Sequence, residues 1–99
     1  MNIIHNMLEH LDEELEGAAE YAEKYIEHKA KGDHTRATKY KEMAQDELNH
    51  ASILRDFFIA DMDSLKKVYT LTEDESHMWE HGCKNINQHM AMVRQMLSM

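Results

Sequence analysis

Only two short segments interrupt a pattern that otherwise favours continuous helix along the whole chain. The sequence has no proline and three glycines, and its most abundant residues include Ala, Leu, Met, Glu and Lys, which are all good helix formers. The first interruption is Lys31-Gly32-Asp33. Gly32 suits the left-handed position that closes a helix, and Asp33 can cap the helix that follows. This segment therefore predicts a tight turn between two long helices.

The second interruption is Val68-Tyr69-Thr70-Leu71, a β-branched and aromatic run that ends in a helix-start signal. Thr72 with Glu75 three residues later has the spacing of a capping box. The sequence therefore predicts an all-α fold in one domain, residues 1–99. Its three helices are expected at about 5–31, 34–66 and 73–98. The first two helices are expected to form an antiparallel hairpin, because the turn at Gly32 is short.

Charge and cysteine content exclude several classes of protein. The net charge of -8 argues against a nucleic-acid partner, since phosphate binding needs a basic surface. A single cysteine, Cys83, cannot form an intramolecular disulfide or a CxxC metal module, and it favours a reducing compartment. Residues 1–10 lack a secretory signal pattern, and no apolar stretch is long enough to cross a membrane. We therefore expect a cytoplasmic protein without a membrane partner.

The first predicted helix places one carboxylate among its apolar residues. Its acidic face is a regular series on the side opposite the apolar stripe: Glu13, Glu16, Glu20, Glu23 and Glu27. Glu14 does not belong to that series, because it lies three residues after Leu11 and four before Ala18. The apolar stripe consists of Leu8, Leu11, Leu15, Ala18, Ala22 and Tyr25.

The second predicted helix repeats this anomaly with two polar side chains. Glu47 falls in the apolar stripe, and His50 follows three residues later among Met43, Leu54 and Phe57, so an ExxH motif lies on a face that should be dry. The stripe itself consists of Ala37, Tyr40, Ala44, Ala51, Leu54 and Phe58.

A carboxylate in an apolar stripe is costly unless it is paired, protonated or bound to a metal. Spacing i, i+3 lets Glu47 and His50 reach one ion from adjacent turns, and the hairpin brings Glu14 to the same region. Oxygen and imidazole ligands suit iron, manganese or zinc. The alternative is that Glu14 pairs with a lysine or lies at the edge of the stripe, and that the three groups form a buried polar network.

One chain carries half of the ligand set of a di-iron carboxylate bundle. Such a site takes a Glu from each of two helices and an ExxH from each of the other two. A homodimer of two hairpins, or a larger even-numbered oligomer, would supply the full set. The sequence thus predicts a four-helix bundle completed by dimerisation, with two metal ions at the subunit interface.

At this point the sequence resembles the ferritin-like superfamily, nearest to rubrerythrins and short encapsulated ferritins. Residues 14–21 look like a rubrerythrin first helix, in which the ligand Glu is followed seven residues later by Tyr, here Tyr21. The stretch from Gly32 to His50 looks like the following helix, and the 33-residue separation of Glu14 from Glu47 also fits. The resemblance covers roughly the first half of the chain. It implies binding of two irons and oxidation of Fe(II) by oxygen or peroxide.

The chain departs from the family pattern in its second half. It has no fourth helix with a second ExxH and no rubredoxin-like CxxC pair. The sequence therefore gives no basis for a full di-iron site within one chain or for an attached electron-transfer domain. The third predicted helix has no clear counterpart in the half-motif.

The third predicted helix offers further polar candidates outside this pattern. His77 and His81 have a spacing that can bind zinc, but they follow the polar face. Glu80 would join a site only if this helix packs beside the ligands. His89 lies on a methionine-rich strip with Met78, Met92, Met96 and Met99, which suits burial between subunits. The apolar seam consists of Trp79, Cys83, Ile86, Met90, Val93 and Leu97.

The histidines outside that helix and the ExxH motif are expected to lie at termini or on the surface. They are His5, His10, His28 and His34. His10 precedes Glu14 by four residues and can therefore support it from the same face.

Two functional hypotheses follow. The first is a ferroxidase- or peroxidase-type di-iron oxidoreductase for iron handling or protection from oxidative stress. In it, Glu47 bridges the metals, Glu14 is a terminal ligand and His50 is the nitrogen donor, with iron as cofactor and Mn or Zn as substitutes. The second is a non-catalytic helical assembly protein, in which the same three residues form a polar network or hold a structural metal.

Overall fold

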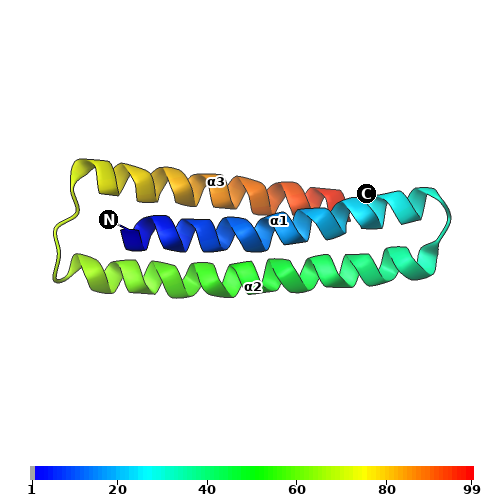
Figure 1. Ribbon diagram of the computed structural model, residues 1–99, viewed down its shortest axis with the longest axis horizontal. Helices are drawn as coiled ribbons and strands as arrows, with labels where there is room; N and C mark the ends of the chain where they lie inside the picture. The colour runs from blue at the N-terminus through cyan, green and yellow to red at the C-terminus, as the bar shows by residue number, and fades with distance from the viewer. Residues whose placement is uncertain (1) are drawn as a thin grey trace.

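The computed structural model describes residues 2–99 as a three-helix rod (Figure 1). The helices are α1 (Asn2–Ala30), α2 (His34–Lys66) and α3 (Glu73–Leu97), and the rod measures 54 × 18 × 18 Å. Helix α1 contacts both α2 and α3 along its length, whereas α2 and α3 contact each other little. The all-α prediction is confirmed, and the predicted helix boundaries agree with the structure to within three residues.

The largest boundary difference lies at the start of α1, which begins at Asn2 rather than near residue 5. The extra turn is held by packing. Ile4 is fully buried in a small cluster with Met7, Met62 and Trp79. Burial of this side chain against α2 and α3 stabilises a helix end that carries no capping signal.

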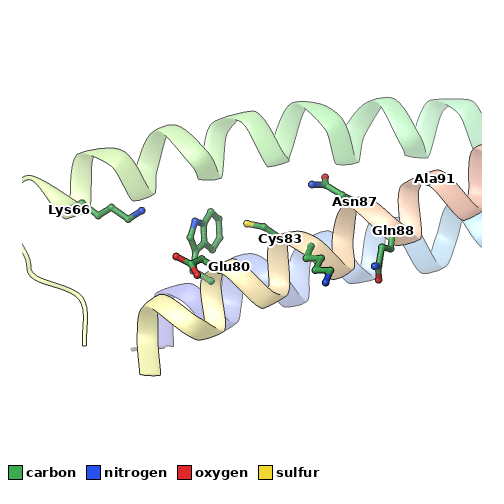
Figure 2. A pocket seen from close by; sticks show the side chains of 8 residues that line it. Lys66, Glu80, Cys83, Asn87, Gln88 and Ala91 are labelled. Carbon is green, nitrogen blue, oxygen red and sulfur yellow. The ribbon is translucent and has the colours of Figure 1, made fainter. Parts of the chain in front are cut away.

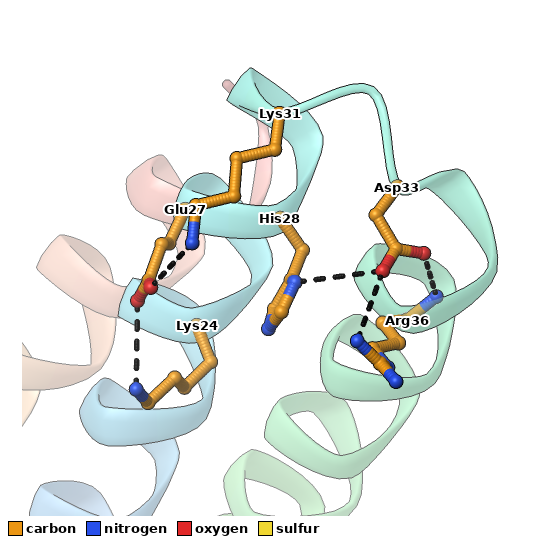
Figure 3. Close-up of polar contacts among 6 residues, drawn as sticks. All are labelled: Lys24, Glu27, His28, Lys31, Asp33 and Arg36. Carbon is orange, nitrogen blue, oxygen red and sulfur yellow. Dashed lines mark hydrogen bonds and ion pairs between the residues drawn. The ribbon is translucent and has the colours of Figure 1, made fainter.

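The turn between α1 and α2 has the predicted geometry (Figure 3). Gly32 has a φ of 79°, in the left-handed region that favours glycine. The Asp33 side chain caps α2 by accepting a hydrogen bond from the backbone N–H of Arg36 at 3.1 Å. This turn makes α1 and α2 an antiparallel hairpin (Figure 1).

His28, which is expected at a terminus or on the surface, lies in the last turn of α1 but is not a surface residue. Its side chain is only 16% exposed, and its ring stacks on the Tyr40 ring with centroids 5.3 Å apart. Its Nδ1 lies 3.8 Å from the Asp33 carboxylate (Figure 3). The short turn brings Tyr40 of α2 back over the last full turn of α1, and this covers the histidine.

The start of α3 is a capping box, as the sequence predicts. Thr72 Oγ1 accepts from the backbone N–H of Glu75 at 3.1 Å, and the Glu75 carboxylate accepts from the backbone N–H of Thr72 at 2.9 Å. The Tyr69 hydroxyl donates to the same carboxylate at 3.1 Å. The backbone hydrogen bond from Thr72 holds the pKa of Glu75 below its ordinary value. Glu75 is therefore a capping residue.

The core lies where the predicted apolar seams meet. The seam of α1 is buried apart from half-buried Leu8, and the seam of α3 is buried apart from half-buried Cys83. In α2 the alanines of the predicted stripe are buried, while Tyr40, Leu54 and Phe58 pack at its edge. Leu48 and Met62 are also buried, although the predicted stripe omits them. They lie on the side of α2 that turns toward α3.

The structure leaves one face of the α1–α2 hairpin without a covering helix. Leu8 approaches Gly82, and Arg55 donates to the Asn87 side chain at 3.0 Å, so α3 packs on one side of the hairpin. We call the face that carries Glu14 and Glu47, away from α3, the open face. Within residues 2–99, no helix combines the length and apolar character that a membrane span requires.

Candidate metal site

The structure brings the three predicted ligands together on the open face. Glu14 comes from the middle of α1, and Glu47 and His50 come from successive turns of α2. One candidate ligand atom from each residue lies within 4.8 Å of the other two. His50 Nδ1 is 3.9 Å from a Glu14 carboxylate oxygen. Among the described residues this is the only cluster of three or more acidic, histidine or cysteine side chains with such geometry.

The two carboxyl groups of the cluster lie close enough to affect each other's ionisation. The pKa of Glu47 is raised above its ordinary value, chiefly by a hydrogen bond with the Glu14 carboxyl group and further by burial and by the Glu14 charge. His50 acts in the opposite direction. Two close carboxylates favour either a shared proton or a cation between them.

No lysine or arginine neutralises this pair within the described part of the chain. The ion-pair partners of Glu14 are His50 and His10, whose Nε2 lies 3.9 Å from the other Glu14 oxygen. The alternative in which Glu14 pairs with a lysine is therefore not observed. His10 does support Glu14 from one turn earlier, as its spacing predicts.

The expectation that this face is dry is wrong for the single chain. The His50 side chain is 60% exposed and that of Glu14 is 25% exposed. The physical reason is the position of α3. It buries the seam that contains Leu15 and Leu48 and leaves the neighbouring face of the same two helices uncovered.

The open face is apolar around the cluster. Met43 and Phe57 share the heptad spacing of Glu47 and His50 on α2, and they are 40% and 60% exposed. The rings of Tyr21 and Tyr40 lie 6.3 Å apart across the hairpin, on the turn side of the cluster. A polar cluster with an exposed apolar border is typical of a surface that a partner covers.

Gly17 lies next to the site, a position that the apolar stripe does not reveal. It lies on α1 one turn after Glu14, and a Cβ atom there would come within 3.7 Å of a Glu47 carboxylate oxygen. This is an ordinary van der Waals distance, so the Glu47 carboxylate packs beside α1 without requiring glycine there. A glycine inside a predicted helix is the available signal, because it costs helix stability without a packing reason.

The other polar candidates of α3 do not join this cluster. His77, Glu80 and His81 are exposed, and His89 is half-buried. Three methionines of the predicted strip, Met78, Met92 and Met99, are exposed, while Met96 packs at the edge of the core.

A separate cleft of about 670 Å³ lies between α2 and α3 (Figure 2). It exists because these two helices diverge, and Lys66, Trp79, Glu80 and Cys83 line it. Cys83 points into the gap toward α2 (Figure 2). Burial raises the pKa of its thiol, so the thiolate is disfavoured and the residue has the character of a packing thiol.

Comparison of the chain with protein-family models, with curated proteins and with solved structures finds no match.

The carboxyl pair predicts how Glu47→Gln changes stability in metal-free protein. The raised pKa of Glu47 means that the native state binds its proton more tightly than the unfolded chain. The protonated Glu47 side chain therefore stabilises the native state at pH values below its ordinary pKa of 4.5. This stabilisation is lost as the pH rises through the raised pKa of the native state. Glutamine removes the repulsion, so the variant should be more stable than wild type by roughly 0.5 kcal/mol at pH 7. The gain should shrink toward pH 4.

Urea unfolding of both proteins in the presence of a chelator, at several pH values, measures this difference. A variant that is less stable than wild type at pH 7 would show that the ionised Glu47 side chain stabilises the metal-free fold.

Proposed function

We propose that this chain is half of a ferritin-like di-iron carboxylate protein, which binds two irons at a homodimer interface and oxidises Fe(II) with oxygen or peroxide. The observation that carries the proposal is the convergence of Glu14, Glu47 and His50 on the open face of the hairpin. Two carboxylates and an imidazole per chain are half of the donor set of a di-iron bundle site.

The donor set fits the metal. Carboxylate and imidazole ligands suit Fe(II), and a cation between Glu14 and Glu47 would remove the repulsion that raises the pKa of Glu47. Since no described lysine or arginine pairs with either residue, the two charges are free to bind a metal. The resemblance of residues 14–21 and 32–50 to rubrerythrins and encapsulated ferritins points to the same metal.

The second copy is required by the exposure of the site. A single chain leaves His50 in solvent and supplies too few ligands to enclose two ions. If two open faces meet around a twofold axis, Met43 and Phe57 are buried at the new interface, and each Glu-plus-ExxH set faces its equivalent. The result is a four-helix bundle made of two hairpins, with each α3 outside it.

Each residue of the cluster would have its own role in such a site. Glu47 would be the carboxylate shared by the two chains' metal site, Glu14 a second carboxylate donor from α1, and His50 the nitrogen donor. His10 holds the Glu14 carboxylate from the adjacent turn. Iron would supply the electrons that reduce oxygen or peroxide, and the apolar border would exclude water from the reacting centre.

The alternative is a non-catalytic assembly protein. The closeness of the Glu14, Glu47 and His50 side chains supports it, because a satisfied polar network can fix the register of an oligomer. Metal content distinguishes the two proposals.

The deciding experiment is iron stoichiometry on anaerobically Fe(II)-loaded protein, coupled to size-exclusion chromatography with light scattering. The proposal predicts about one iron per chain, by the two-metal stoichiometry of such bundles, in a dimer or larger even-numbered assembly. Exposure to air should then consume oxygen. A well-folded oligomer without iron above background would overturn the ferroxidase proposal and support the polar network.

A further inference from the structure

A second cluster of metal-binding side chains lies on α3, away from the open face. His77 and His81 are one helical turn apart, and both are exposed. Their rings lie nearly parallel, with centroids 5.9 Å apart and an angle of 8° between the planes. The capping box, the core and the proposed iron site use neither residue.

We propose that His77 and His81 form a surface chelate site for a divalent transition-metal ion that prefers imidazole, such as Zn²⁺ or Ni²⁺. Two histidines at i, i+4 on one helix face can direct one nitrogen each at the same ion. The parallel rings already project from the same side of α3, so rotation about the side-chain bonds brings those nitrogens together. Water completes the coordination, which leaves the site open.

The local charge favours a cation. Residues 73–83 contain four acidic side chains and no lysine or arginine. Asp74 precedes His77 by three residues and therefore lies on the same side of the helix. Lys84, the nearest basic residue along the helix, follows His81 by three residues. The net field around the pair thus raises the local concentration of divalent cations.

The site differs from the proposed iron site in ligand chemistry. Imidazole-only ligation selects ions late in the first-row series, whereas the carboxylate-rich cluster at Glu14 accepts iron or manganese. Metal bound by His77 and His81 would also clamp two successive turns of α3 close to Trp79, which anchors this end of the helix in the core. Binding to the folded form alone would stabilise the protein.

The test is a Ni²⁺ titration of the full chain, followed through the NMR signals of the histidine rings, which paramagnetic Ni²⁺ broadens. The variants are His77→Gln, His81→Gln and the control His5→Gln, which removes an exposed histidine that pairs with Glu9 instead. Repeating the titration with Glu47→Ala keeps the result independent of the iron site.

The proposal predicts that the signals of His77 and His81 broaden together, before those of His5 and His34. It also predicts that either glutamine variant weakens Ni²⁺ binding at the remaining partner by at least about tenfold, because a second linked ligand binds at high effective concentration. In the His5→Gln control, the His77 and His81 signals should broaden at the same Ni²⁺ concentrations as in the unmodified protein. If His81 responds to Ni²⁺ identically with and without the His77 ring, the two residues bind independently and the chelate site is disproved.

Discussion

Replacing Glu47 with alanine is expected to remove iron from the protein while leaving the fold of each chain intact. Glu47 lies beside Glu14 across the hairpin and one turn from His50 on α2. It is also the proposed bridge between two metal positions. Each dimer would therefore lose two bridging carboxylates, and iron affinity should fall at least about 100-fold, because even residues that only support a ligand contribute 10–100-fold.

Asp46→Ala is the matched control for this variant. Asp46 adjoins Glu47 on α2, is exposed and lies outside the cluster. Both substitutions remove one carboxylate from the same helical turn, so they change the net charge alike. Iron content by elemental analysis and oxygen consumption should fall for Glu47→Ala and stay near wild type for Asp46→Ala. Equal losses in both variants would mean that general negative charge, not a defined site, attracts the metal.

Assembly state separates the two proposed functions in the same experiment. A metal site at a dimer interface predicts a Glu47→Ala protein without iron that still unfolds cooperatively. A structural polar network predicts instead that iron is absent from wild type too, and that the substitution changes the oligomer measured by light scattering.

Helical periodicity and the two helix-interrupting segments, residues 31–33 and 68–71, were sufficient to predict the three helices and most of the core. Leu15 and Met90 are fully buried where their seams predict. The cluster was predictable for the same reason. The spacing of Glu47 and His50 fixes one helix face, and the tight turn at Gly32 aligns α2 with α1 so that Glu14 lies opposite.

The side on which α3 packs could not be predicted from the sequence. Helix α2 has apolar residues on two adjacent faces, one with Leu48 and one with Phe57, and periodicity gives no reason to choose between them. Packing of α3 beside Leu48 explains why that residue is buried while Phe57 and His50 are exposed. The exposure of the site therefore depends on the tertiary packing of α3 and not on the pattern of either ligand-bearing helix.

Gly82 explains how α3 is held on the chosen side, and it carries the largest expected effect on stability. A Cβ atom at this position would lie 2.4 Å from Leu8 Cδ1 and 3.1 Å from Leu8 Cγ. The Leu8 side chain in its observed conformation therefore leaves no room for a Cβ atom at this position and would have to move. Helix propensity alone would make Gly82→Ala favourable by up to about 1 kcal/mol, but the steric overlap should reverse the sign.

We expect Gly82→Ala to destabilise the protein by about 1–3 kcal/mol, the usual cost of an added methyl group in a packed interface. Gly17→Ala is the control, because Gly17 is also within a helix and its Cβ would make only an ordinary contact of 3.7 Å with Glu47. That variant should be neutral or more stable, by up to about 1 kcal/mol. Denaturant unfolding of metal-free protein measures both.

A double-mutant cycle with Leu8→Ala identifies the cause. If overlap with the Leu8 side chain produces the loss, Gly82→Ala should cost far less when Leu8 is already alanine, giving a coupling energy of about 1–3 kcal/mol. Additive losses would place the defect elsewhere on α3. Coupling of this size would show that a close contact between a glycine and a leucine fixes α3 against α1, which leaves the face with Glu14, Glu47 and His50 open for a second chain.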